Sequence, residues 1–296
     1  MLRRFLLLFF ALILAAPAYA DQDPDWTTPV APFRIADNLY YVGSRDLAAY
    51  LVTTPAGNIL INSNLESSPP LIRASIEKLG FKFSDTKILL ISHAHFDHAA
   101  GSAQIKALTG AQYMVMQQDV PYVDGSGGAL LPGTTIPPAK VDRVLQDGST
   151  VELGGVVLTA HLTPGHTPGC TTWTMRVTDG GKSYNVVIVG SPNVNSVDKL
   201  VENRRYPQIV ADYETTFRVL YTLPCDIFLG AHGGYFDMLK KLDEPVVPGK
   251  NRFVDHAGYI AYVKDREQAF RKELLRQRRE FVSHLPTAVP PGVTIK

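Results

Sequence analysis

The residues best suited to catalysis lie together in the segment "HAHFDH", residues 93–98. Within six positions it contains four side chains that can bind a metal ion: His93, His95, Asp97 and His98. Imidazole nitrogens and carboxylate oxygens are common zinc ligands. The segment follows the apolar run "KILLIS", which is typical of a strand buried on both faces. Four such side chains at the end of a buried strand predict a metal site rather than ordinary packing.

Two further histidines follow predicted strands in the same way. His166 lies in "TPGHTPG" after the strand "VVLTAHL", and His232 lies in "LGAHGG" after the strand "CDIFL". Loops at the ends of rigid strands often carry binding residues. The remaining histidines have ordinary positions, within a strand, before a helix and near the C-terminus: His161, His256 and His284.

The six candidate donors fit two metal ions better than one. Catalytic zinc usually has three protein ligands and one position for water. Residues two apart in an extended segment point to the same side, so His93 and His95 can share one ion. Asp97 and His98 then face a second ion, and the two later histidines complete one set each. Two metal ions held close together form a hydrolytic pair.

The elements that would position these residues alternate between strands and helices. Strands are expected at 38–43, 47–54, 57–63, 87–92, 111–117, 149–155, 156–163, 170–177, 184–190 and 225–229, with a hairpin turn at 55–58. Helices are expected at 69–80, 99–110, 212–223 and 260–281. The Gly- and Pro-rich segment 121–140 is expected to be a loop, either a plain connector or a pocket wall. This order predicts an α/β fold with two mixed sheets and helices outside.

Composition bounds the remaining possibilities. The chain has 296 residues and a net charge of +1, so no basic field favours nucleic acid as a partner. Residues 1–20 have the form of a signal peptide with cleavage after Ala20, and their apolar stretch is short for a membrane span of about 20 residues. The mature protein is therefore expected in the periplasm and free of the membrane. Cys170 and Cys225 are expected to be buried thiols rather than a disulfide, although an oxidising compartment permits one.

The quoted motifs resemble those of the metallo-β-lactamase fold superfamily. "HAHFDH" matches its H-x-H-x-D-H motif, and "PGHTPG" and "GAHGG" are similar to its later histidine loops. The resemblance extends from Phe33 to Phe281. Thioesterase-like members carry a metal-bridging aspartate in a "GD" pair where this chain has Gly190-Ser191. Serine at this position resembles subclass B3, as do "GNILINSNLESS", "RYPQIVADYETTF" and "LPCDIFLGAHGGYFD".

The Pro- and Asp-rich residues 21–32 are expected to form an extended lead-in, and the Pro-rich residues 283–296 a flexible tail. Between them, the resemblance implies a four-layer αβ/βα sandwich over residues 33–282. It implies two zinc ions, the first on His93, His95 and His166. The second is held by Asp97, His98 and His232. Ser191 and Asn193 would bind the substrate carboxylate.

The activity that the resemblance implies is hydrolysis of penicillins, cephalosporins and carbapenems by a metal-activated hydroxide, in a monomer that acts on a small molecule. A lactonase or other ester or thioester hydrolase of the same fold is the alternative. A nuclease is a less favoured alternative, because the composition shows no basic groove for nucleic acid. A zinc-storage protein is another alternative, but it would need no open coordination position.

Overall fold

The computed structural model describes residues 23–284. The predicted signal peptide lies outside the described residues, as does the predicted tail apart from its first two positions. Of those two, Ser283 is the last residue of a helix and His284 is its C-cap. The N-terminal lead-in, expected to be extended, instead begins with the 3₁₀ helix η1 (Pro24–Trp26).

The first sheet has seven strands in sequential order. They are β1 (Phe33–Ala36), β2 (Leu39–Tyr41), β3 (Tyr50–Thr54), β4 (Gly57–Ile61), β5 (Thr86–Leu90), β6 (Gln112–Met116) and β7 (Arg143–Leu145). Strands β1 to β4 pair antiparallel, whereas β4 to β7 pair parallel. Because parallel strands end at the same edge, the segments that follow β5 and β6 lie beside each other.

The second sheet has five strands in the order β12-β11-β10-β9-β8. Their bounds are β8 (Thr150–Leu153), β9 (Val156–Leu162), β10 (Thr171–Asp179), β11 (Lys182–Val189) and β12 (Ile227–Gly230). Pairing is antiparallel from β8 to β11, and β12 joins β11 parallel. Both sheets are therefore mixed, as the sequence predicts.

Helices connect the strands and cover both outer faces. They are α1 (Pro69–Lys78), α2 (Phe96–Ala99), α3 (Ser102–Thr109), α4 (Val120–Val123), α5 (Ile209–Thr222), α6 (Met238–Asp243) and α7 (His256–Ser283), with short 3₁₀ helices η2 (Phe83–Asp85), η3 (Gln117–Asp119) and η4 (Gly233–Phe236). Pro69 and Pro70 open α1, where a missing N–H costs nothing. Gly110 ends α3 in the left-handed conformation that glycine adopts easily, with φ of 69°.

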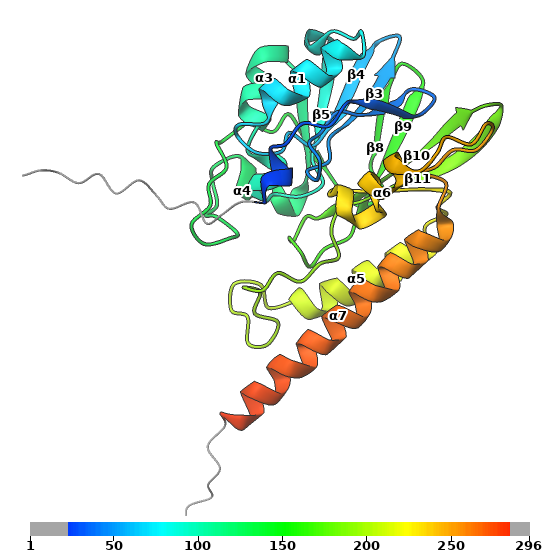
Figure 1. Cartoon of the computed structure of the whole chain (residues 1–296). Coiled ribbons are helices and arrows are strands. Elements are labelled where there is room, and N and C mark those ends of the chain that lie inside the picture. The colour runs from blue at the N-terminus through cyan, green and yellow to red at the C-terminus, as the bar shows by residue number, and fades with distance from the viewer. Residues whose placement is uncertain (1–22, 285–296) are drawn as a thin grey trace, which may run out of the picture.

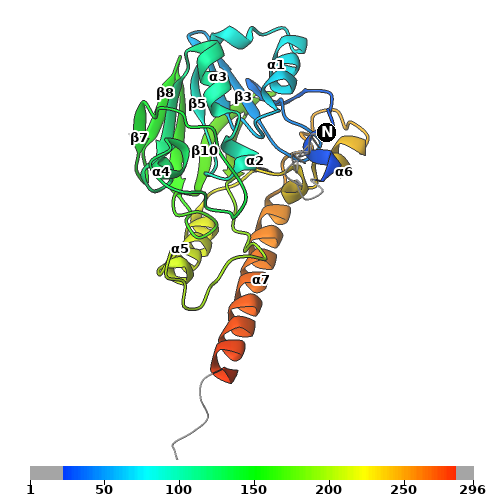
Figure 2. The same ribbon diagram turned by 90° about the vertical axis from the view of Figure 1, so that its left-hand side faces the viewer.

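Two hydrophobic clusters define four layers. The larger cluster includes side chains of both sheets together with α5 and α7, such as Trp173 and Phe270. The smaller one lies between the first sheet and helices α1 and α3, and includes Ile72, Ile105 and Tyr113. Figure 1 shows α1 and α3 on one side and α5 and α7 on the other, and Figure 2 shows the same arrangement after a quarter turn. The predicted αβ/βα sandwich of two face-to-face sheets is confirmed.

Several local expectations need correction. The predicted loop 121–140 begins inside α4. The turn expected at 55–58 comprises Pro55 and Ala56, and Gly57 and Asn58 belong to β4, as the expected strand 57–63 requires. The short elements β1, β7 and α6 were not expected. Cys170 and Cys225 are both free and buried, as predicted. Among residues 23–284, no helix is both long and apolar enough to span a bilayer.

Candidate metal centre

The six predicted donors converge although they come from three separate parts of the chain. His93 and His95 follow β5, and Asp97 and His98 lie in the single turn of α2. His166 lies in the loop between β9 and β10, and His232 follows β12. The change from an extended backbone at His95 to a helical turn at α2 directs the first two and the last two side chains of the motif differently.

The first set consists of His93, His95 and His166. One nitrogen from each ring lies within 4.8 Å of the other two. Nδ1 of His95 lies 3.1 Å from Nε2 of His166, and the rings of His93 and His166 are 4.6 Å apart between centroids. His93 and His95 are buried, and His166 is partly buried. Three imidazoles at this spacing can bind one ion.

The second set consists of Asp97, His98 and His232. Oδ2 of Asp97 lies 3.1 Å from Nε2 of His98 and 3.5 Å from Nε2 of His232. The two Nε2 atoms are 3.1 Å apart. His93 also approaches Asp97 and His98 within the spacing of a metal site, so the two sets adjoin each other.

Hydrogen bonds fix which nitrogen of two rings faces the centre. Nδ1 of His166 donates to the carbonyl oxygen of Asn193 at 2.7 Å. Nδ1 of His232 lies 2.7 Å from Oδ2 of Asp46, whose other oxygen accepts from the N–H of Gly234 at 3.0 Å. When the proton sits on Nδ1, the Nε2 lone pair is available to a cation. Asp46 was not expected from the sequence.

Burial keeps most of these histidines neutral. It lowers the pKa of His95 to about 4 and lowers the pKa of His93 and His166 well below the usual value. Burial also lowers the pKa of His232, but the neighbouring Asp46 and Asp97 outweigh it and raise that pKa to about 9. These two carboxylates therefore favour a positive charge at His232, whether a proton or a metal ion.

The donor set fits a metal pair. Nε2 of His93 is buried and has no hydrogen-bond partner among the described residues, and Nε2 of His98 faces Asp97 and His232. Burial raises the pKa of Asp97, but His98 and His232 outweigh it and hold that pKa well below its usual value, so the carboxylate is anionic at neutral pH. Buried neutral imidazoles with converging lone pairs and one anionic oxygen make a typical metal-binding environment.

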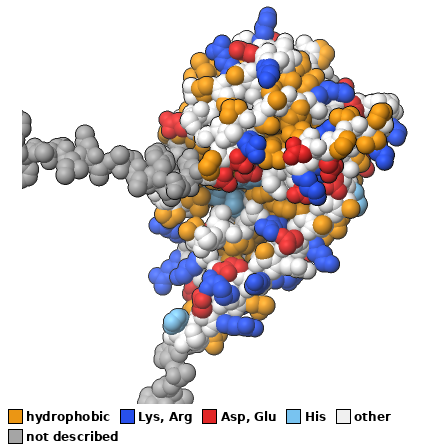
Figure 3. Space-filling view, in the orientation of Figure 1, with side chains coloured by type: hydrophobic (Ala, Val, Ile, Leu, Met, Phe, Trp, Pro, Cys, Tyr) orange, Lys and Arg blue, Asp and Glu red, His pale blue; other side chains and the backbone are white. Residues whose placement is uncertain are grey.

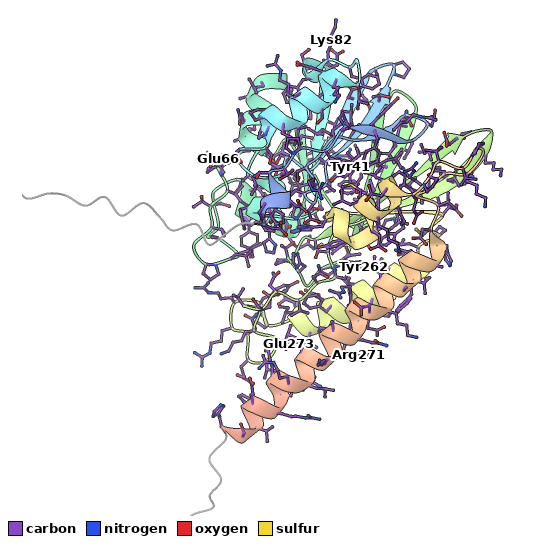
Figure 4. All side chains as sticks on the ribbon, in the orientation of Figure 1. Tyr41, Glu66, Lys82, Tyr262, Arg271 and Glu273 are labelled. Atoms are coloured by element: carbon purple, nitrogen blue, oxygen red, sulfur yellow. The ribbon has the colours of Figure 1, made fainter. Side chains whose placement is uncertain are left out.

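The two predicted substrate-binding residues lie together after β11. The hydroxyl of Ser191 is 3.1 Å from that of Tyr235, and Nδ2 of Asn193 donates to the same tyrosine oxygen at 2.9 Å. The ring of Tyr235 lies 5.1 Å from that of His232 and 5.1 Å from that of Tyr262, which Figure 4 labels at the junction of α7 with the sheets. This polar cluster is therefore adjacent to the second metal set.

Two further residues near the centre were not expected. Trp26 of η1 has its ring 6.0 Å from His232 and 6.1 Å from Phe96, so the lead-in forms part of the surroundings of the site. Asp119 follows β6 and hydrogen-bonds to both loops of the first set. Its pKa is about 6, because burial raises it more than its hydrogen bonds lower it. Figure 3 shows pale blue histidine surface in a hollow near the middle of this face.

The other sequence predictions of this region lie away from the donors. His161 is in β9, where it bonds to Thr174, and His256 begins α7. Leu130 and Ile136 of the 121–140 segment pack against the smaller hydrophobic cluster. That segment's role as a pocket wall stays a prediction.

Comparisons with known proteins identify the family. Residues 45–232 match the model of the metallo-beta-lactamase superfamily. The structure resembles the native FEZ-1 metallo-beta-lactamase from Legionella gormanii, with a TM-score of 0.82 and 55% identity over 85% of this chain and 98% of that one. It also resembles BJP-1, a subclass B3 metallo-beta-lactamase of Bradyrhizobium japonicum, with a TM-score of 0.83 and 37% identity over 87% of this chain and 98% of that one.

Curated relatives match over shorter segments. A probable metallo-hydrolase of Burkholderia pseudomallei is 34% identical over 88 residues, which is 29% of this chain and 30% of that protein. A hydroxyacylglutathione hydrolase of a Methylobacterium strain is 26% identical over 121 residues, 41% of this chain and 40% of the relative. The chain thus spans less than half the length of these two proteins. The whole-chain matches are decisive: this chain belongs to the metallo-β-lactamase superfamily and groups with its subclass B3.

Proposed function

We propose that this protein is a zinc-dependent β-lactam hydrolase. The observation that carries the proposal is the agreement between the six-donor centre and the similarity to metallo-β-lactamases over 85% or more of the chain. One solved relative, LRA-12 from an Alaskan soil metagenome, is described as a class B3 di-zinc enzyme and is 36% identical over 85% of this chain. Two zinc ions are therefore proposed here as well.

His93, His95 and His166 would hold the first ion, and Asp97, His98 and His232 the second. When bound, the pair would supply Lewis acidity that polarises the lactam carbonyl and makes water acidic enough to act as a nucleophile at neutral pH. Oxygen from water adds to the carbonyl carbon, the carbon–nitrogen bond of the ring breaks, and the nitrogen receives a proton. No serine or cysteine nucleophile is required.

The chain's own residues orient the reactants. Asp97 offers an anionic oxygen that can accept a hydrogen bond from the attacking water. Ser191 and Asn193 would bind the substrate carboxylate, and Tyr235 connects the two. Ser191 and Tyr235 have two hydroxyl hydrogens, and their mutual bond uses one. The other remains available for an anionic ligand.

An ester or thioester hydrolase is the second candidate, favoured by the partial similarity to a hydroxyacylglutathione hydrolase. Against it stands Ser191, which occupies the position where thioesterase-like members carry a bridging aspartate. A serine there removes one negative charge from the metal pair, and the ions then polarise a carbonyl more strongly. An amide-like carbonyl is less electrophilic than a thioester and would benefit more.

The decisive experiment measures hydrolysis of a penicillin, a cephalosporin and a carbapenem by purified protein of known zinc content. An acyl-homoserine lactone and a glutathione thioester serve as competing substrate classes. The proposal expects β-lactam turnover that depends on zinc and exceeds turnover of the other two classes. Efficient cleavage of the lactone or thioester without β-lactam turnover would favour the second candidate.

The proposal extends to carbapenems among the substrates, to a monomeric state and to export into the periplasm through residues 1–20. An export signal suits an enzyme that meets antibiotics outside the cytoplasm. Fractionation of cells that produce the full chain, with N-terminal sequencing of the mature protein, tests the location and cleavage after Ala20. Sedimentation of the purified protein tests the monomer.

A further inference from the structure

One buried carboxylate near the centre has no place in the reaction described above. Asp119 is 1% exposed and follows β6, the parallel neighbour of β5. Its Oδ2 accepts hydrogen bonds from the N–H of Ala94 and the hydroxyl of Thr167, both at 2.8 Å. Its Oδ1 accepts from the N–H of Gly169 at 2.7 Å. Three short bonds from two different loops define its position.

These donors are immediate neighbours of the metal-binding histidines. Ala94 lies between His93 and His95, and Thr167 follows His166. A single carboxylate therefore joins the segment that carries two ligands of the first set to the loop that carries the third. The second set has no such connection, because none of the donors to Asp119 belongs to the His232 loop.

The loop that carries His166 approaches this carboxylate unusually closely. A Cβ atom added at Gly169 would lie 2.7 Å from both Cβ and Cγ of Asp119, and 2.6 Å from its backbone nitrogen. Contacts this short between a methyl group and buried atoms require one of them to move. Glycine at 169 therefore permits the loop to rest directly on the carboxylate.

The electrostatic surroundings of Asp119 also concern the metal centre. No Lys or Arg contributes to its environment within the described residues. Burying an unpaired charge is costly unless hydrogen bonds or cations compensate for it. The three donors compensate in part, and cations bound at the adjoining histidines would compensate further.

We propose that Asp119 is a positioning residue for the first metal set, holding the His166 loop against the His93–His95 segment at the spacing that one ion requires. The proposal depends on the metal centre of the proposed function but not on the identity of the substrate. A purely structural role would instead lower the stability of the whole fold and affect both metal sets alike.

Zinc binding measured in two backgrounds separates these roles. His232→Ala leaves the first set intact, and His166→Ala leaves the second. Zinc dissociation constants are measured by competition with a chromophoric chelator, with and without Asp119→Asn. Because one amide oxygen cannot serve all three donors, we expect zinc binding about tenfold weaker or more in the His232→Ala background. No change is expected in the His166→Ala background.

Two further variants complete the test. Gly169→Ala displaces the loop without altering charge and should also weaken only the first set, so it carries the test if Asp119→Asn does not fold. Asp226→Asn is the matched control, because the carboxylate of Asp226 also accepts hydrogen bonds from a backbone N–H and a side chain, both of Asn185, and neither belongs to a loop of the metal centre. It should leave zinc binding unchanged in both backgrounds.

The proposal is overturned if Asp119→Asn leaves first-set affinity unchanged or weakens both backgrounds equally. Circular dichroism of the metal-free variants checks the fold. The zinc-binding assay contains no β-lactam, so its result does not depend on the substrate. If the protein bound zinc in this pattern but hydrolysed no β-lactam, the proposed function would be wrong and the role of Asp119 would still hold.

Discussion

Asp46→Asn should weaken zinc binding at the second set. The carboxylate of Asp46 makes two hydrogen bonds, to Nδ1 of His232 at 2.7 Å and to the N–H of Gly234 at 3.0 Å. Asparagine offers one oxygen for these two donors, so its amide group must face one of them. The variant therefore loses at least one bond and also the negative charge that orients the ring.

The size of the effect follows from these contacts. A hydrogen bond to a charged group contributes about 1.5–3 kcal/mol. Loss of a carboxylate that orients a metal-binding histidine typically weakens metal affinity about 10–100-fold. At about 1.4 kcal/mol for each factor of ten, the two ranges agree. We therefore expect one of the two zinc dissociation constants to rise about 10–100-fold, while the other stays near its original value.

The assay is competition for zinc between the protein and a chromophoric chelator, fitted with two constants. Glu77→Gln is the matched control: Glu77 forms an exposed ion pair with Arg73 on α1, away from the strand ends that carry the donors. Surface pairs of this kind contribute about 0–1 kcal/mol. If Asp46→Asn bound both ions as tightly as the parent, the orienting role of Asp46 would be wrong.

The remaining predictions concern the reaction and the fold. Asp97→Ala should abolish nitrocefin turnover and weaken the second ion, and a chelator should remove the parent's activity until zinc is restored; undiminished turnover in the variant would contradict the assigned role. Tyr235→Phe should raise KM for β-lactams more than it lowers kcat, because Ser191 and Asn193 lose their shared partner, whereas Tyr221→Phe should change neither constant. Burial raises the pKa of Asp198 to about 6, so the folded state binds its proton more tightly than the unfolded chain, and this component of stability declines as pH rises from about 4 to about 6. Asp198→Asn should remove that decline, which is at most about 3 kcal/mol. The free energy of unfolding in urea is measured for both proteins at the two pH values, and an equal fall in the variant and the parent would contradict the prediction.

The metal donors could be found in the sequence because their type and placement are both unusual. His93, His166 and His232 each follow an apolar strand and lie next to small residues, and few packing roles need that combination. The fold class followed from the alternation of strands and helices. Short edge elements gave no such signal: β7, at three residues, is too short to show a period.

The residues that support the donors were missed for a different reason. Asp46 and His232 are 186 positions apart, and Tyr235 meets Ser191 across 44. An aspartate in "SRDL" or a tyrosine in "GGYF" is locally ordinary, and its role arises only when distant strands are brought together. A general sign was nevertheless present for Asp119, which lies two positions after the predicted strand 111–117, the next strand in sequence after the histidine motif.

The distribution of charge near the metal centre, like these distant contacts, could not be predicted from the sequence. Net charge over the whole chain is +1, which predicts no highly charged macromolecular partner. Locally, however, Asp46, Asp97 and Asp119 lie around the histidines, and the charged groups that act most strongly on Asp46 and Asp97 are histidines rather than Lys or Arg. A proton on His232 or a bound cation can balance these carboxylates, because Asp46 and Asp97 raise the pKa of His232 to about 9. This concentration of negative charge, seen only after folding, therefore adds to the histidine motif in favouring a cation at the second set.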